Sequence, residues 1–306
     1  MPDDLLRYYA TPGVFTTLGP FAEQLDALPN DVGGLAHAVQ MVLLHRFWAQ
    51  AYQVEVTQER ENEQGYHGAE AMLAHAMKLG ARRVGDVRLP AARVLGNCRH
   101  FSTMMCAFLR QKGIPARARC GFSTYFEPGK YVDHWVCEYW NAGESRWVQV
   151  DAQLDSLQRR VTKADFDPLD VPRNRFLVAG DVWRQIRAGG IDASKCGIAD
   201  MWGDWFVLGD LALDVASLQR VELLPWEPFG MLGIEREPRP RPRAADVDAL
   251  IDRVAALTAR GDDASILELL SLAESDARLR PPAATIEAAL AADLAGPTVG
   301  NPISTT

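Results

Sequence analysis

The sequence predicts an α+β fold in which a helix packs on an antiparallel sheet. Apolar residues recur at helical spacing from about Cys98 to Lys112. Strand-like patterns follow directly within 116–154. Helical patterns flank this segment on both sides, so we expect a mixed core with helical N- and C-terminal additions.

Composition places the chain among ordinary globular proteins. Of its 306 residues, 48% are hydrophobic and 24% charged, which predicts a sizeable core. A formal net charge of −8 argues against nucleic acid or an anionic membrane as a partner, because both attract basic surfaces. No apolar run has the length of a membrane span, and Met1–Asp4 lacks the layout of a signal peptide. We therefore expect a cytoplasmic location.

No metal or cofactor motif stands out. The five cysteines are scattered and odd in number, which favours reduced thiols over a disulfide framework, and no C-x-x-C pair suggests zinc. A group of aspartates lacks the spacing of a calcium loop, so we expect caps and solvated faces there. These residues are Asp200, Asp204, Asp210 and Asp214. No cofactor and no metal ligand is predicted.

The N-terminal third is expected to be helical. Turn residues dominate residues 1–30, around one short helix near 21–28. Asp31 is expected to cap a long helix that includes Leu35 through Ala51, and a second helix covers 67–79. His45, on the long helix, is interpreted as an ordinary histidine.

The helix from Cys98 stops at Gly113 and Pro115, in the order typical of a helix C-terminus. Residues 116–126 alternate between apolar and polar, which predicts a half-buried strand. The next two strands are expected from His134 to Trp140 and from Arg146 to Leu154, joined by a hairpin loop.

The C-terminal half has fewer strand signals. Residues 155–175 read as loop with short helix, and the Trp-rich stretch 176–226 as mostly helices with turns. A Pro/Arg linker is expected at 236–243. Three further helices and a frayed tail complete the chain. The helices are expected at about 245–259, 264–275 and 284–294, and the tail at 296–306.

Cys98 is the first candidate for chemistry. It lies on the first turn of its helix, where Asn97 can act as the cap. A thiol becomes a good nucleophile as a thiolate, and both a helix N-terminus and a neighbouring imidazolium lower its pKa. The backbone N–H of Cys98 could also help to hold an oxyanion.

The hairpin supplies a candidate base and a carboxylate. If Trp140 pairs with Ser145, the paired residue numbers sum to 285, and His134 faces Asp151. Directly opposite residues have β-carbons ~5 Å apart, which permits an Asp–imidazole hydrogen bond. A different register would remove this opposition.

Each of these residues alone would have an ordinary structural role; it is their combination that predicts a Cys-His-Asp triad. His100 is a rival base, but residues i and i+2 do not face each other on a helix. The remaining thiols near the site read as core or surface cysteines. They are Cys106, Cys120 and Cys137.

Several separated motifs, taken in order, resemble the core of the transglutaminase-like superfamily over about residues 95–155. They are Gly96-Asn97-Cys98-Arg99-His100-Phe101, Gly113-Ile114-Pro115, Asp133-His134-Trp135 and Trp147-Val148-Gln149-Val150-Asp151. The resemblance implies a papain-like α+β core in a bacterial-type member. It also implies roles: Cys98 as nucleophile, His134 as general base and then acid, and Asp151 as the orienting group.

This chain departs from the family pattern at two places. Arg99-His100 replaces the small and aromatic residues common after the cysteine, and Ala152-Gln153 replaces a frequent Pro-Thr after the aspartate. Neither change removes a triad member, but both leave the substrate open. The oxyanion partner upstream of the cysteine is not identified; Gln64 and Trp48 are two guesses.

The resemblance favours a cysteine-dependent acyl-transfer enzyme acting on a peptide, amide or thioester. Hydrolysis, as in an amidase or thiol protease, is slightly favoured. Transglutaminase-type amide formation, with an amine acceptor or a carrier protein as partner, is the first alternative. A non-catalytic binding protein on the same fold is the second.

The predicted domain organisation follows these motifs. Residues 1–94 form the helical N-terminal part of the catalytic domain, and 95–235 the transglutaminase-like core with its helical extension. Beyond the linker at 236–243, residues 244–306 form a small helical C-terminal region.

Overall fold

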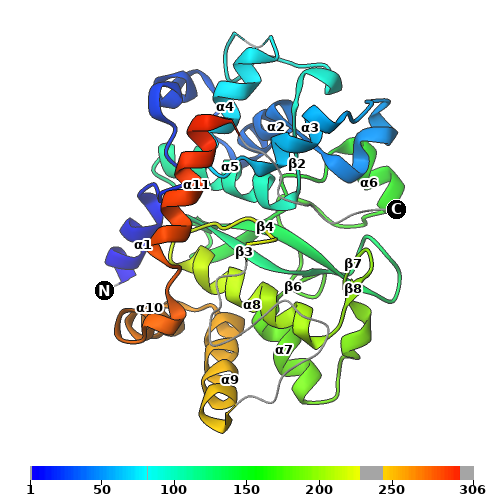
Figure 1. The fold of residues 1–306 in the computed structure, drawn as a ribbon. Helices are drawn as coiled ribbons and strands as arrows, with labels where there is room; N and C mark the ends of the chain where they lie inside the picture. Colours follow the sequence, from blue (N-terminus) through cyan, green and yellow to red (C-terminus); the bar gives the residue numbers. More distant parts are fainter. Residues whose placement is uncertain (1, 81, 228–243, 297–306) are drawn as a thin grey trace.

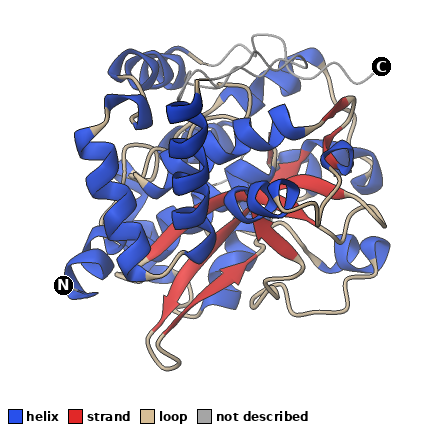
Figure 2. Ribbon diagram, turned by 90° about the horizontal axis from the view of Figure 1, so that it is seen from below, coloured by secondary structure: helices blue, strands red, loops and turns tan. Residues whose placement is uncertain are grey.

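A computed structural model describes residues 2–80, 82–227 and 244–296. It is an α+β structure in which a mixed sheet lies between two groups of helices (Figure 1). Figure 2 shows the strands gathered in the interior with helices around them. None of the described helices has the length and apolarity that crossing a membrane requires.

The α-helices follow the expected order with some additions. They are α1 (Pro2–Ala10), α2 (Val32–Val42), α3 (Gln58–Asn62), α4 (Ala69–Lys78), α5 (Cys98–Gln111), α6 (Ser156–Thr162), α7 (Ala179–Arg187), α8 (Asp204–Leu218), α9 (Ala245–Arg260), α10 (Asp263–Ser275) and α11 (Ala283–Ala295). Short 3-10 helices occur as well, at Gly19–Ala27, Arg46–Tyr52, Glu63–Gly65, Pro90–Ala92, Ala193–Lys195 and Ala277–Leu279.

The strands form a small parallel pair and a larger sheet. They are β1 (Leu43–His45), β2 (Val94–Gly96), β3 (Ala116–Ser123), β4 (Tyr131–Asn141), β5 (Arg146–Val150), β6 (Phe176–Val178), β7 (Cys196–Ile198) and β8 (Met201–Trp202). The larger sheet has the order β6-β3-β4-β7-β8, and β5 also pairs with β4. Strands β1 and β2 pair in parallel.

Strand β4 shares one of its edges between two partners. Its outer half, from Cys137 to Asn141, pairs with β5, while Tyr131 and Val132 pair with β7 in parallel. Residues 133–136 therefore lie in a gap between these two ladders. His134 is in this gap, so the sheet leaves room for side chains to converge there.

Helix α5 forms as its sequence predicts. The Asn97 side chain accepts a hydrogen bond from the Arg99 N–H at 3.1 Å, and the Asn97 N–H donates to His100 Nδ1 at 3.1 Å. These bonds satisfy backbone groups that a helix N-terminus would otherwise leave unpaired. The helix ends before Gly113, which adopts φ +73°, a left-handed conformation that glycine tolerates.

The long helix predicted over Leu35 to Ala51 is wrong in its second half. Asp31 caps α2 as expected, accepting from the Gly34 N–H at 2.8 Å. The chain then becomes extended at Leu43, because β1 pairs with β2, and continues as a 3-10 helix from Arg46. Tertiary pairing here overrides apolar periodicity. The N-terminal helix α1 was not predicted.

The prediction that strand β3 is half-buried is also wrong, because both of its faces are covered. Helix α5 packs on the face of Cys120. On the other face, the buried side chains of Arg117 and Arg119 meet carboxylates: Glu138 Oε2 lies 2.7 Å from Arg117 Nε and 3.0 Å from Arg119 Nη1. Buried charges are tolerated when paired in this way.

Helix α8 completes this network through Asp214. Its carboxylate accepts two hydrogen bonds from Arg119, both at 2.9 Å, and one from the Cys120 N–H at 3.0 Å. Arg119 also donates to the Thr258 carbonyl of α9. Buried apolar residues of α9 and α10 belong to the same hydrophobic core as α5 and β3. The linker predicted at 236–243, and all but residue 296 of the predicted tail, lie outside the described residues.

Removing the Asp214 carboxylate should destabilise the fold strongly. Asp214→Ala leaves part of the Arg119 guanidinium buried without its bidentate partner, so we expect a loss of about 3–5 kcal/mol in the free energy of unfolding. The exposed pair Arg253–Glu268 provides the control, and Glu268→Ala should cost less than ~1 kcal/mol. Urea unfolding followed by circular dichroism measures both; equal losses would contradict the prediction.

Candidate functional site

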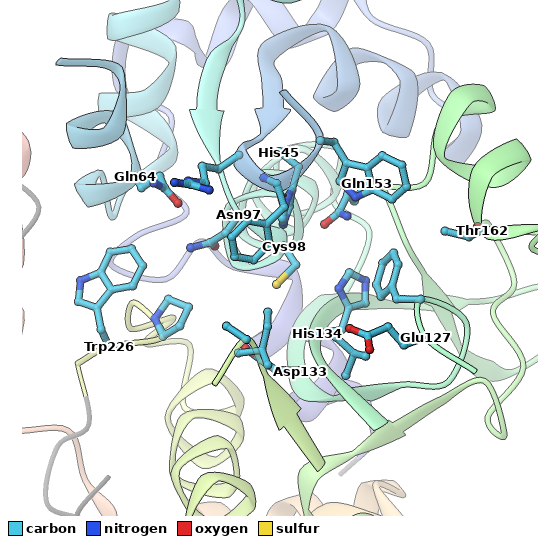
Figure 3. A pocket seen from close by; sticks show the side chains of 18 of the residues that line it. His45, Gln64, Asn97, Cys98, Glu127, Asp133, His134, Gln153, Thr162 and Trp226 are labelled. Atoms are coloured by element: carbon cyan, nitrogen blue, oxygen red, sulfur yellow. Dashed lines mark hydrogen bonds between the residues drawn. The ribbon is translucent and has the colours of Figure 1, made fainter. Parts of the chain in front are cut away.

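A pocket of about 840 Å³ opens over the gap along β4. Cys98, Asp133 and His134 lie on its wall, with side chains from seven other regions of the chain (Figure 3). Those further residues include His45, Phe47, Trp48, Gln58, Glu61, Gln64, Phe126, Glu127, Gln153, Val161, Ile198 and Trp226. The wall is therefore partly aromatic and partly acidic or amide-bearing.

Cys98 reaches the pocket from the first turn of α5. Strand β2 ends at Gly96 and the cap at Asn97 turns the chain into the helix. The thiol is 6% exposed, and Figure 3 shows its sulfur directed into the pocket. The sequence thus led correctly to a cysteine at a capped helix start, and the structure adds that this cysteine borders a cavity.

His134 and Asp151 are in direct contact, although the predicted register is wrong. Trp140 pairs with Trp147, so paired residue numbers sum to 287, and the ladder ends at Cys137–Val150. The Asn141 side chain accepts from the Gly143 N–H at 3.0 Å, which closes a loop displaced from the predicted one. A shift of two residues preserves the face of each side chain.

Because that face is preserved, Asp151 lies diagonal to His134 rather than opposite it. Diagonal neighbours remain within reach of long side chains. His134 Nε2 lies 2.8 Å from Asp151 Oδ2. Nδ1 is then the imidazole nitrogen that remains for other partners, on a ring that borders the same pocket as Cys98.

Asp151 is fully buried and held from three directions. Besides His134, the Tyr125 hydroxyl donates to Oδ2 at 2.6 Å and the Gln153 N–H donates to Oδ1 at 3.0 Å. Burial by itself would raise the pKa of Asp151, but His134 and these donors outweigh it and lower the pKa. The carboxylate is therefore charged at neutral pH.

Aromatic rings enclose the imidazole of His134. Phe126 meets it edge to face at a centroid distance of 5.0 Å, and Tyr125 at 5.8 Å. These rings limit the access of water to the His134–Asp151 hydrogen bond, which strengthens it. The ring orientation is thus set by packing as well as by Asp151.

The sequence predicts a lowered pKa for the Cys98 thiol, but the surroundings of Cys98 raise this pKa. Burial raises the pKa of Cys98 well above its usual range, and the nearby Asp133 carboxylate raises it further. Backbone N–H groups of Trp135 and Arg99 lower it, but by less. Cys98 is therefore a neutral thiol at neutral pH unless its proton passes to a neighbour.

The position of His100 agrees with the prediction that it is a disfavoured base, whereas the position of His45 differs from the predicted one. His100, the rival base, is fully buried and serves as part of the α5 cap, in line with its disfavoured geometry. His45 was predicted on a helix, but it lies in β1, where pairing with Gly96 places it on the pocket wall with Cys98. Its Nδ1 accepts from the Phe47 N–H at 3.2 Å.

Burial is the main reason that the pKa of His45 is lowered to about 3, and the neighbouring His134 lowers it further. The ring of His45 is therefore neutral. With Nδ1 accepting a hydrogen bond, the ring proton is on Nε2. Sequence reasoning missed the pairing of β1 with β2. Its signal in the sequence is weak and consists of two short apolar runs, one before His45 and one before Gly96. Gln64 and Trp48, the two guesses for an oxyanion partner, both line the pocket.

The four aspartates that do not fit a calcium loop were expected at helix caps and on solvated faces, but two of them are buried. Asp210 and Asp214 are fully buried, and Asp214 binds Arg119. Among the described residues, side-chain atoms of Cys120, Asp133 and Asp210 lie within 4.8 Å of one another, at a spacing that a metal ion could use. All three residues take part in other interactions, so no metal role is assigned.

Comparisons with known proteins agree with the resemblance in the sequence. A family model described as the transglutaminase-like superfamily matches residues 50–152. No curated protein matches. Among solved structures, red sea bream transglutaminase matches with 19% identity and a TM-score of 0.29, over 44% of this chain and 26% of that enzyme.

A candidate cysteine protease from Cytophaga hutchinsonii matches with 17% identity and a TM-score of 0.20, over 54% of this chain and 49% of the other. The chain thus spans about a quarter and about half of these two proteins. Such distant likenesses carry no argument about the reaction. The family match covers the segment that delivers Cys98 and His134 to the pocket, so over residues 50–152 this chain is similar to the transglutaminase-like superfamily.

Proposed function

We propose that this protein is a cysteine-dependent acyl-transfer enzyme in which Cys98 is the nucleophile, His134 the general base and then acid, and Asp151 the orienting carboxylate. One observation carries the proposal: Cys98 and His134 border the same pocket while His134 Nε2 is hydrogen-bonded to buried Asp151. That arrangement leaves Nδ1 as the nitrogen that receives the thiol proton.

Acylation begins with the neutral thiol. Nδ1 of His134 takes the Sγ proton as the sulfur forms a bond to the carbonyl carbon of an amide or thioester, and the carbonyl oxygen becomes an oxyanion. Asp151 stabilises the imidazolium that results. The imidazolium then gives its proton to the leaving nitrogen or sulfur, the bond to that atom breaks, and a thioester remains on Cys98.

The oxyanion requires donors placed before the reaction starts. The Cys98 backbone N–H, on the first turn of α5, is one candidate. His45 is the second, because its neutral ring carries a proton on Nε2 at the pocket wall. Gln64 is a weaker candidate, since its amide nitrogen already donates to Glu61 at 2.7 Å.

We propose hydrolysis as the second half-reaction. His134 removes a proton from water, which attacks the thioester and releases the free acid and the thiol. Acidic and amide side chains at the pocket, such as Gln58, Glu61 and Glu127, support this step because they favour bound water. If a primary amine attacks instead, the product is an amide, and the same acyl-enzyme serves both outcomes.

Acylation by p-nitrophenyl acetate tests the reaction class. We expect one acetyl group on Cys98 by intact mass and none on Cys98→Ala; Cys196→Ala, which changes another buried thiol, should behave as wild type. Acetate release without an added amine indicates hydrolysis, and acetyl-amide formation in the presence of a primary amine indicates transfer. An unacetylated Cys98, or unchanged turnover in Cys98→Ala, would contradict the proposal and favour a binding protein.

Alkylation tests the electrostatics of Cys98. Because burial and Asp133 raise the thiol pKa, we expect the iodoacetamide rate at Cys98 to keep rising with pH through and beyond the range of an ordinary thiol. Asp133→Asn removes a nearby negative charge, which should shift this pH profile to lower pH. Glu127→Gln, at the same pocket but paired with Lys130, should shift it less. A plateau in the rate below pH 7 in the wild type would show that the thiolate is already formed.

Substitutions at Asp151 test the orienting role. Asp151→Ala should lower kcat for p-nitrophenyl acetate by about 10²–10⁴-fold, because His134 loses the acceptor that holds its ring. Asp151→Asn should cost less, since an amide oxygen can still accept from Nε2. Tyr125→Phe removes one hydrogen-bond donor to Asp151 Oδ2 and should lower kcat by about tenfold. Tyr139→Phe is the control, because Tyr139 lies on β4 five residues beyond His134. Equal activity of Asp151→Ala and wild type would remove Asp151 from the mechanism.

A further inference from the structure

Trp226 borders the pocket on the side away from His134. Figure 3 shows Cys98 between the two, with Gln64 on the same side of the view as Trp226. In the proposed reaction His134 protonates the leaving group, so the leaving group lies on the His134 side. The remaining acyl part of the substrate then extends toward Trp226.

A carboxylate holds the segment that carries Trp226. Both oxygens of Glu227 lie 2.9 Å from His67 Nε2, and Oε2 also accepts from the Leu224 N–H at 3.2 Å. The Glu227 N–H in turn donates to the Leu224 carbonyl at 2.9 Å. These bonds close a tight turn around Trp226, so its position depends on that of His67.

His67 is itself held by the C-terminal helix. Asp293 of α11 accepts from the His67 N–H at 2.7 Å and from the Gly68 N–H at 2.8 Å, and its Oδ1 lies 3.7 Å from His67 Nδ1. Burial would lower the pKa of His67, but Asp293 and Glu227 outweigh it and raise the pKa. The imidazole thus lies between two carboxylates from elements far apart in the chain.

The segment around His67 is also hydrogen-bonded to the start of α5, next to Cys98. Arg99 directly follows Cys98 and is fully buried; its Nη1 donates to the His67 carbonyl at 2.7 Å, and its Nη2 donates to the Glu222 carbonyl. Arg99 therefore links the start of α5 both to the His67 loop and to the chain that leads to Trp226. Trp226 is positioned relative to Cys98 by a continuous set of hydrogen bonds.

We propose that Trp226 is a specificity-determining wall for the acyl group, and that Glu227, His67 and Asp293 are its positioning residues. The inference rests on the proposed acyl transfer at Cys98. An indole face favours a flat apolar or aromatic group.

The test compares two acyl donors with the same leaving group: p-nitrophenyl phenylacetate and p-nitrophenyl acetate. The measured quantity is the ratio of their second-order rate constants for acylating Cys98, because changes in thiol reactivity cancel in it. We expect the wild type to prefer the phenylacetyl group more than the free thiol of cysteine does. In Trp226→Ala this preference should fall about three- to tenfold, and Trp226→Phe should retain most of it.

The positioning residues are tested in the same way. Glu227→Ala and Asp293→Ala keep the Trp226 side chain but remove hydrogen bonds that fix its position. The ratio of rate constants should therefore fall in both variants. Leu294→Ala is the matched control for Asp293, because Leu294 is the next residue of α11 and is 91% exposed. Thermal unfolding of each variant identifies any that lose their fold; a merely structural effect would slow both esters equally and leave the ratio unchanged.

The outcomes separate this inference from the proposed function. If neither ester acylates Cys98 in the wild type, the acyl-transfer proposal fails, and this inference fails with it. If both esters acylate Cys98 but Trp226→Ala keeps the wild-type ratio, the inference alone is overturned. A ratio that falls in Trp226→Ala but not in Glu227→Ala would retain Trp226 as the wall and overturn the positioning role.

Discussion

The gap along one edge of β4 is the constraint on which the site depends. Pairing with β5 holds the outer half of β4, and pairing with β7 holds its beginning. Between them, His134 is fixed by a continuous ladder with β3 on its other edge. A strand that is held on one side and open on the other presents a rigid side chain to a cavity, as the role of base that we propose for His134 requires.

The network under β3 makes this rigidity possible. Arg119 joins β3 to Asp214 of α8, and Glu138 of β4 joins the same guanidinium to Arg117. Such buried ion pairs add little stability compared with apolar packing, but they tolerate only one arrangement of the strands and helices. The network and the site lie on the same strand, since Glu138 is four residues beyond His134. The register that satisfies Glu138 therefore also determines where His134 points.

If Cys98 is the nucleophile, as we propose, its burial has a chemical consequence. A thiol with a raised pKa is protected from adventitious oxidation and alkylation, because the thiolate is the reactive form. It can still react if a base removes its proton while a substrate carbonyl is present. The charged Asp151 provides that possibility, since it stabilises imidazolium on His134 only as the proton arrives. Under the proposed mechanism, reactivity therefore depends on substrate binding, and the resting protein carries little free thiolate.

Local signals predicted the elements of the site, and long-range pairing explains what they missed. Asn97 before Cys98 identified the capped helix, and alternation over residues 116–126 identified the strand that pairs with the one carrying His134. The parallel pairing of β1 with β2 could not be foreseen, because each strand has three residues and the two are far apart in sequence. For the same reason His45 was assigned to a helix. The register of the hairpin failed because the Asn141 side chain, and not loop length alone, selects the turn.

The two residues that depart from the family pattern after Cys98 have clear structural roles. His100 completes the cap of α5 through Asn97, a bond that a small residue could not make. Arg99 reaches the His67 and Glu222 carbonyls, so it joins the nucleophile helix to the segments that surround the pocket. A guanidinium with five donors can satisfy several buried carbonyls from a single position. The residues beside Cys98 thus join α5 to the segments that surround the pocket. Under the proposed mechanism, substrate selection then falls to segments outside residues 50–152, with Trp226 as the proposed example.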